Sequence, residues 1–213
     1  MRITVFGAAG SVGSRVVTEA LARGHDVTAV VRDAARFSEL DPKANAQVGD
    51  ANQIDDVVKL STDQDIVITA TRPAAGNESE LVRITQSLLT GMNQSGVRLL
   101  LVGGAGGLTV PNSNGTLVVD DPKYVAPAWR DIAVACVEQL ELCLKDKETN
   151  WTYLSPAAMM LPGERTGQFR LGQDELLIDA DGESKISVED LAVALVDEAE
   201  QVKFPRARFT VAY

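Results

Sequence analysis

The chain has 213 residues, of which 45% are hydrophobic and 23% are charged, and its formal net charge at pH 7 is −10. This composition is typical of a soluble globular protein, and the excess of negative charge argues against nucleic acid or an anionic membrane as a partner. No apolar run reaches the roughly 18 residues that a membrane span needs. Cys136 and Cys143 lie two turns apart on one predicted helix, so they cannot pair within it, and with a single histidine they indicate no metal site. We therefore expect a cytoplasmic protein without a metal.

Strand and helix patterns alternate over the first half of the chain. The expected strands are 3–6, 26–31, 46–48, 65–70 and 97–102. Helical patterns lie between them, the first ending near Gly24 and the others at 33–40, 54–60 and 78–94. Strands that are separated by helices predict a Rossmann-like, doubly wound α/β fold with a mainly parallel sheet and helices on both faces.

The second half is less regular. A long segment at 103–127 precedes an amphipathic helix at 128–144 and a sixth strand at 151–154. Residues 156–186 are broken by glycines and contain strand-like pieces at 168–171 and 175–178. We interpret them as a small substrate-side lobe within a single domain, 1–213. A capping-box pattern at Ser187 starts the last helix, and 208–213 is expected to be a final edge strand.

The first turn carries the most specific motif. A strand leads into Gly7, Gly10 and Gly13, and a helix follows. In this context Gly7 turns sharply off the strand, Gly10 lets a pyrophosphate approach the backbone, and Gly13 lets the helix pack close to the sheet. The free N–H groups of Ser11, Val12 and Gly13 would then face the anion. The alternative is an ordinary glycine-rich turn, and the context favours nucleotide binding.

The end of the second strand bears on which dinucleotide is bound. Arg32 takes the first position after Val31, where an acidic residue would favour NAD(H), and its guanidinium can hold a 2′-phosphate. Arg15 and Arg36 could add positive charge. Asp33 could instead bind a ribose hydroxyl, and Arg32 could be a solvated loop residue. We predict NADP(H) in preference to NAD(H).

Later strand ends supply further candidates. Asp50 and Ala51 could meet an adenine edge, with Asp50 as a helix cap the alternative or additional role. Segment 70–73 could line the nicotinamide ribose. The glycines at 103–107 let the backbone approach a ligand closely, or else form a flexible loop.

The motifs together resemble a known family. The glycine turn, Val30-Val31-Arg32-Asp33, Gly49-Asp50, segment 102–106 and segment 186–192 are similar to atypical short-chain dehydrogenases/reductases. More narrowly, the chain resembles the NmrA-like NAD(P)H-binding proteins, which are often described as NADH-flavin reductases and are related to biliverdin reductase B. The resemblance implies a Rossmann fold, bound NADP(H) and, in some members, reduction of flavins or quinone-like acceptors. It also implies that Pro156 and Ala157 contact the nicotinamide end.

The predicted cofactor-binding residues share a position at or just after a strand end: Gly7, Ala9, Gly10, Ser11, Val12, Gly13, Arg32, Asp50, Ala51, Ala70, Thr71, Arg72, Gly103, Gly104, Pro156 and Ala157.

The chain departs from typical short-chain dehydrogenases at the catalytic positions. They use Tyr-x-x-x-Lys, but Ala128 follows Tyr124 at that spacing and Ala157 follows Tyr153. The segment after the fifth strand offers no hydroxyl before Thr109. Tyr124 is the best candidate for a proton donor, with a packing aromatic as the alternative. Trp129 could wall a flat acceptor, although covering the core is favoured.

Three functions follow from these observations. The first is an NADPH-dependent reductase of a flavin- or quinone-like acceptor, because hydride transfer to such a ring needs positioning more than a dedicated acid. The second is a non-catalytic NADP(H)-binding redox sensor. A nucleotide-sugar epimerase or dehydratase is disfavoured by the missing Tyr-x-x-x-Lys and the small lobe. We expect a monomer or homodimer.

Overall fold

The computed structural model describes all 213 residues and is built on one large sheet. Its eight strands lie in the order β3-β2-β1-β4-β5-β6-β10-β8, and only β8 runs antiparallel to its neighbour. The strands are β1 (Arg2–Phe6), β2 (Asp26–Val31), β3 (Asn45–Val48), β4 (Ile66–Thr69), β5 (Arg98–Val102), β6 (Trp151–Pro156), β8 (Arg170–Gly172) and β10 (Arg208–Ala212). This order confirms the predicted Rossmann-like fold.

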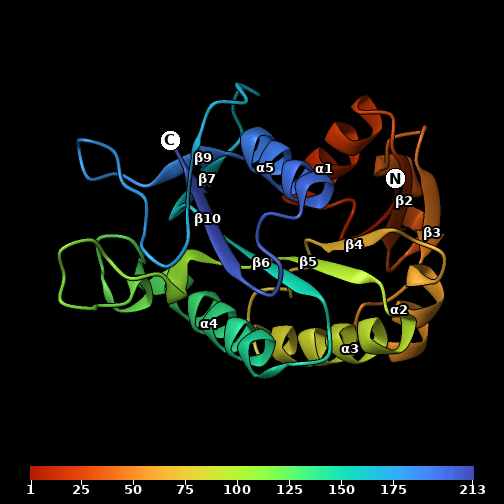
Figure 1. The fold of residues 1–213 in the computed structure, drawn as a ribbon, viewed down its shortest axis with the longest axis horizontal. Helices are drawn as coiled ribbons and strands as arrows, with labels where there is room; N and C mark the ends of the chain where they lie inside the picture. The colour runs from red at the N-terminus through yellow and green to blue at the C-terminus, as the bar shows by residue number, and fades with distance from the viewer.

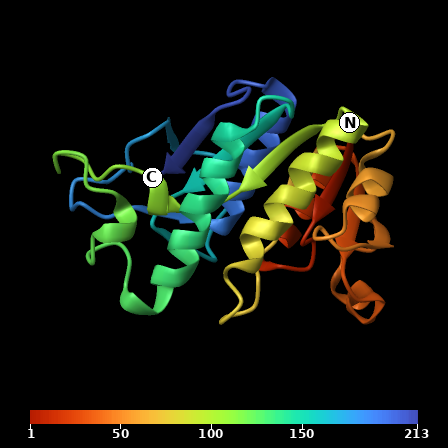
Figure 2. The ribbon, with the colours of Figure 1, turned by 90° about the horizontal axis from the view of Figure 1, so that it is seen from below.

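Helices cover both faces of the sheet (Figure 1). One face is covered by α1 (Ser11–Ala22) and α5 (Val188–Gln201), which pack against each other. The other face carries α2 (Ile54–Ser61), α3 (Glu80–Ser95) and α4 (Arg130–Lys145). Figure 2 shows α3 and α4 side by side against the sheet. The chain therefore forms three layers, with a hydrophobic core on each side of the sheet.

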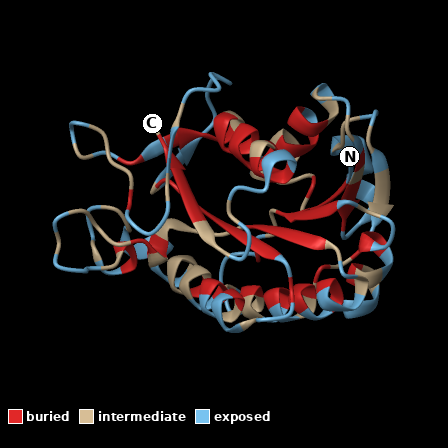
Figure 3. Cartoon of the chain, viewed as in Figure 1, coloured by how far each residue is buried: buried red, intermediate tan, exposed pale blue.

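The central strands are buried on both faces, as Figure 3 shows. Leu99, Leu100 and Leu101 of β5 are fully buried although alternate side chains point to opposite faces. A continuously apolar strand is what a parallel sheet between two helical layers requires. None of the helices is both long and apolar enough to cross a bilayer.

The C-terminal half corrects two predictions. Strand β10 is not an edge strand, because it pairs with β6 on one side and with the short antiparallel β8 on the other. Residues 175–178 do not form a strand, and only Glu175 makes an isolated bridge, to Thr109. A second, two-stranded sheet of β7 (Met159–Leu161) and β9 (Lys185–Ser187) was not predicted.

The start of α5 has half of the predicted capping box. The Ser187 hydroxyl accepts a hydrogen bond from the Asp190 amide at 2.9 Å. The Asp190 carboxylate does not return to the cap. It accepts from the Thr166 hydroxyl, the Gly167 amide and the Tyr213 hydroxyl. This buried carboxylate therefore ties the loop before β8 and the end of β10 to the first turn of α5.

Candidate functional site

The candidate site lies at the edge of the sheet where the parallel strands end. Strands β3, β2, β1, β4, β5 and β6 run in the same direction, so their carboxyl ends share one edge. The strand order reverses between β1 and β4, and ligands of open α/β sheets bind at such a switch point. Gly7 lies there, so close to β4 that a Cβ on it would be 2.7 Å from the carbonyl oxygen of Ala70.

The glycine turn that joins β1 to α1 admits almost no side chains. Gly7 has a φ of +78°, which L-residues with side chains rarely adopt. A Cβ on Gly13 would lie 2.1 Å from the Gly7 carbonyl oxygen, and one on Gly10 would lie 3.1 Å from the same oxygen. The Gly10 amide also donates to that oxygen, at 2.9 Å. The three glycines therefore let α1 begin directly against the end of β1.

This turn leaves hydrogen-bond donors free at the start of α1. The first bond of the helix runs from the Ser14 amide to the Gly10 carbonyl at 3.0 Å. The amides of Ser11, Val12 and Gly13 have no hydrogen-bond partner within the protein, and the first turn contains no acidic residue. Free amides at the positive end of a helix dipole fit a pyrophosphate.

Of the three arginines considered near this turn, only Arg32 is unpaired. It follows β2, is exposed, and makes no hydrogen bond or ion pair. Arg36 donates to the Ala9 carbonyl at 3.1 Å and pairs with Glu39 at 2.7 Å. Arg15 pairs with Glu189 at 3.1 Å.

The competing residue Asp33 has a structural role. Its carboxylate accepts from the Ala35 amide at 2.9 Å and starts a short 3-10 helix, Ala34–Glu39, where the sequence predicted a short helix. Arg32 is therefore the free charge at this strand end.

The carboxylate after β3 holds the turn that precedes α2. Asp50 accepts from the Asn52 amide at 2.9 Å, and its own amide donates to Asp56 at 2.9 Å. Ala51 is buried beside it. The helix α2 begins at Ile54 with Gln53 at its N-cap and no side-chain cap bond, so the expectation that Asp50 caps a helix is wrong. Contact with an adenine stays a prediction for both residues.

Backbone and small residues form the floor beyond β5 and β6. A Cβ on Gly103 would fall within 1.9 Å of the Tyr153 ring, and one on Gly104 would lie 2.9 Å from the Cys136 sulfur. The Gly103 amide donates to the Leu154 carbonyl at 2.9 Å, and Ala157 is buried. The side chains of Tyr153 and Cys136 pack so close to these two positions that both must be glycine.

The residues after β4 point in different directions. Thr71 shares a hydrogen bond with Thr69 at 3.1 Å between hydroxyl oxygens. The Arg72 guanidinium lies over the ring of Trp129, 5.2 Å from its centroid. Trp129 is 58% exposed, so the expectation that it covers the core is wrong. It lies in a 3-10 turn, Pro127–Trp129, that leads into α4 rather than inside that helix.

Tyr124 lies beside a lysine that the Tyr-x-x-x-Lys pattern does not include. Its hydroxyl donates to the Gly182 carbonyl at 3.1 Å, and the Lys123 ammonium donates to the same oxygen at 2.8 Å. The ammonium lies 5.0 Å from the centre of the tyrosine ring. A tyrosine and a lysine thus converge on one oxygen, but they are adjacent in sequence, so a search at the usual spacing cannot find them.

The same tyrosine also packs against a small hydrophobic cluster. It borders Leu108, Val118 and Leu176, which gather the loops beyond the sheet edge. Its packing role is therefore present, and proton donation stays a prediction.

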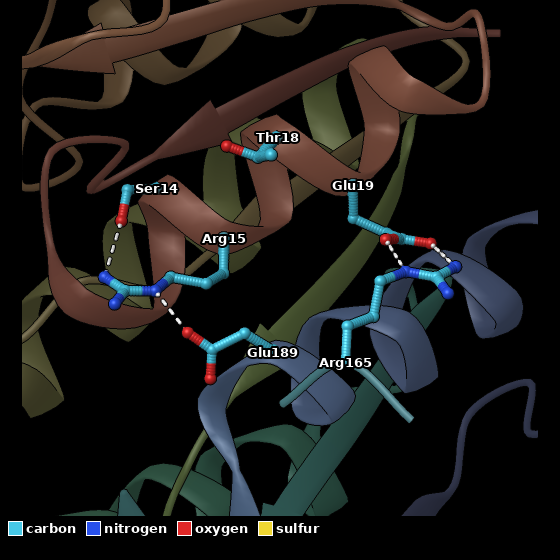
Figure 4. A pocket seen from close by; sticks show the side chains of 6 residues that line it. All are labelled: Ser14, Arg15, Thr18, Glu19, Arg165 and Glu189. Carbon is cyan, nitrogen blue, oxygen red and sulfur yellow. Dashed lines mark hydrogen bonds and ion pairs between the residues drawn. The ribbon is translucent and has the colours of Figure 1, made fainter. Parts of the chain in front are cut away.

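A cavity of about 320 Å³ lies away from the strand ends, between α1, α5 and the loop that carries Arg165 (Figure 4). Its two arginines are both neutralised, Arg15 by Glu189 and Arg165 by Glu19 at 2.6 Å. The hydrogen bond from Arg165 holds the pKa of Glu19 below its ordinary value, although burial opposes this. The cavity therefore offers a ligand no unpaired charge.

The cysteines supply no reactive thiolate. Both are free, and burial raises the pKa of Cys136 and of Cys143 to about 12. No cluster of His, Cys, Asp and Glu side chains suited to a metal ion is present.

Comparison with known proteins is consistent with this geometry. The chain is 35% identical to the uncharacterised protein YwnB of Bacillus subtilis, over 99% of this chain and 98% of that protein. A Bacteroides thetaiotaomicron structure provisionally named an epimerase has a TM-score of 0.90 at 37% identity, covering 100% of this chain and 96% of that one. A Streptococcus pneumoniae structure provisionally named an NADH-flavin reductase has a TM-score of 0.80 at 31% identity, covering 100% and 99%.

The sequence also matches the NAD(P)H-binding family over residues 7–201, from the first glycine of the turn to the end of α5. The chain therefore belongs to the NAD(P)H-binding family, and it fits the atypical short-chain dehydrogenase/reductase group with NmrA-like members.

Proposed function

We propose that the protein is an NADPH-dependent reductase that transfers a hydride to a planar acceptor, a flavin or a quinone. The observation that carries this proposal is the glycine turn, where the amides of Ser11, Val12 and Gly13 are unpaired. The turn would hold the pyrophosphate of the dinucleotide. The name of the Streptococcus pneumoniae relative supports a flavin as acceptor.

Arg32 supports the choice of NADP(H) over NAD(H). It is unpaired at the end of β2, where a dinucleotide places its adenine ribose, and a guanidinium binds a phosphate bidentately. Asp33 caps a 3-10 helix instead of offering its carboxylate freely.

The proposed reaction requires little acid–base catalysis from the protein. A bound NADPH would supply the hydride, and the acceptor would take up that hydride with one proton, leaving NADP⁺ and an acceptor reduced by two electrons. The chain's own residues would position the two rings over the floor formed by Gly103, Gly104 and Ala157. The proton would come from Tyr124 or from solvent.

Steady-state oxidation of NADPH, followed at 340 nm with FMN, FAD, riboflavin and short-chain quinones, tests the proposal. We expect turnover with at least one acceptor and a higher kcat/KM for NADPH than for NADH. Absence of turnover across all these acceptors, with NADPH bound, would contradict a reductase.

One observation favours a second candidate, a redox sensor that binds NADP(H) without chemistry. The Tyr124 hydroxyl is already bonded to the Gly182 carbonyl, and no hydroxyl follows β5 before Thr109. A sensor needs two conformations, and NADP⁺ and NADPH must favour different ones. A ligand shifts such an equilibrium only by the difference in its affinity for the two conformations. Hydrogen exchange that differs between the two complexes, without turnover, would favour this candidate.

We expect the protein to act in the cytoplasm, where its two free thiols would stay reduced, and to be a monomer or homodimer. Cell fractionation and light scattering test these two expectations.

A further inference from the structure

We propose that Arg72 and Trp129 form the docking point for the acceptor and select flat acceptors that carry an anionic group. The proposal rests on the reductase function above and names its substrate class. Its starting point is the stacking of the Arg72 guanidinium over the Trp129 ring at 5.2 Å.

Arg72 is one of only two arginines whose guanidinium has no hydrogen bond or ion pair. The other is Arg32, and every remaining arginine has a carboxylate or carbonyl partner. The chain carries a net charge of −10, so carboxylates are abundant. Glu78, in the same loop as Arg72, accepts from the Gly76 amide at 2.9 Å. That hydrogen bond and the nearby charge of Arg72 lower the pKa of Glu78, but the two side chains form no ion pair. The two unpaired cations therefore remain available to anions from solution.

Both unpaired arginines lie at the candidate site. Arg32 follows β2 and Arg72 lies just after β4, and these strands flank β1 with its glycine turn. A phosphorylated dinucleotide places its 2′-phosphate on the β2 side, because the adenine ribose lies there. The 2′-phosphate would therefore pair with Arg32 and leave Arg72 unpaired. The charge on the β4 side is left for a second anion, and the acceptor is the second ligand that a reductase binds.

Trp129 gives the docking point its aromatic surface. It is the most exposed of the large hydrophobic side chains, at 58%. Its backbone is held in a 3-10 turn, because its amide donates to the Ala126 carbonyl at 2.9 Å. An exposed indole on this turn, beside an unpaired guanidinium, matches a ring that carries a negative group.

FMN and riboflavin test the charge requirement, since they share one ring system and differ by a phosphate. We would measure kcat/KM for both with NADPH in the wild type and in Arg72→Met, with Arg83→Met, at an exposed position of α3, as the matched control. We expect the wild type to prefer FMN by about tenfold, Arg72→Met to lose that preference, and Arg83→Met to keep it. A variant that binds NADPH more weakly lowers kcat/KM for both acceptors alike, so the ratio of kcat/KM for FMN to that for riboflavin does not change.

The same preference in Arg72→Met as in the wild type, or a wild type that does not prefer FMN, would overturn the proposal.

A binding experiment separates this proposal from the reductase function. Of the two tryptophans, Trp151 is only 2% exposed, so Trp129 dominates quenching by a surface ligand. With NADP⁺ bound, FMN should quench the emission at lower concentration than riboflavin does, and Arg72→Met, which keeps the Trp129 fluorophore, should abolish that difference.

Such quenching without turnover would contradict the reductase and support the docking point. Turnover with equal use and equal binding of FMN and riboflavin would support the reductase and contradict the docking point.

Discussion

The carbonyl oxygen of Gly7 occupies the space that a side chain at Gly13 would need, since a Cβ there would lie 2.1 Å from that oxygen. This contact fixes how closely α1 follows β1. The unpaired first amides of α1 therefore lie at the switch point of the sheet, where open α/β sheets bind their ligands.

Gly13→Ala should therefore damage the cofactor site through the backbone. The added methyl group must push α1 away from β1, at a cost of about 1–3 kcal/mol in the free energy of unfolding. Affinity for NADPH should fall below detection in isothermal titration, because the amides move out of position. Gly24→Ala is the control. Gly24 lies just after α1 with a φ of +80°, and a Cβ there would contact nothing. The substitution should lower the free energy of unfolding by about 1 kcal/mol and leave NADPH binding intact. Equal NADPH affinity in both variants would contradict this role of the turn.

Arg32→Ala should separate the two nicotinamide cofactors. We expect the Kd for NADPH to rise about tenfold or more, because a charge-assisted contact to the 2′-phosphate is lost. The Kd for NADH should change less than twofold, and Arg83→Ala should change neither. An Arg32→Ala protein whose NADPH affinity stays within a factor of two of the wild type would refute the assignment.

Tyr124→Phe tests the proposed proton donor. We expect kcat for NADPH oxidation to fall about tenfold or more, with the KM for NADPH unchanged, since general acid catalysis contributes at least this much where solvent cannot replace the donor. Tyr213→Phe also removes a hydroxyl that makes hydrogen bonds, to Asp190 and Ser187, and should leave kcat unchanged. If Tyr124→Phe loses stability but keeps the wild-type kcat, its hydroxyl serves only to hold the Gly182 loop.

The pairing of Arg165 with Glu19 should make stability depend on pH in a definite direction. Hydrogen bonds from Arg165 and then Arg23 hold the pKa of Glu19 below its ordinary value of 4.5, against the effect of burial. A carboxyl group with a lowered pKa stabilises the fold above its ordinary pKa and loses that contribution as the pH falls through the lowered value.

Thermal unfolding of the wild type and Arg165→Met should therefore differ most above about pH 4.5 and converge in more acidic solution. A difference that stays constant from pH 7 down to pH 3 would show that Arg165 acts only by packing.

The sequence predicted the first half of the fold well because its signals are local. The continuous apolar run at Leu99–Leu101 and the glycine turn each specify structure within a few residues. The position of β10 depends instead on β8, a strand of three residues that overlaps the strand-like piece predicted at 168–171 but whose pairing with β10 no sequence pattern specifies. An edge assignment requires knowledge of every strand that pairs, so it could not come from 208–213 alone.

The candidate site divides in the same way. The glycines and Arg32 follow from motif and strand end. The exposure of Trp129 and its contact with Arg72 depend on how two loops far apart in the sequence meet. Lys123 escaped notice because it approaches Tyr124 from the adjacent position and through the carbonyl of Gly182, which no spacing rule describes.

A crystal structure of the protein with NADP⁺ tests the central claim most directly. We predict pyrophosphate oxygens within about 3 Å of the amides of Ser11, Val12 or Gly13, and the 2′-phosphate on Arg32. A dinucleotide bound elsewhere, such as in the cavity between α1 and α5, or a glycine turn left empty at saturating NADP⁺, would contradict the account.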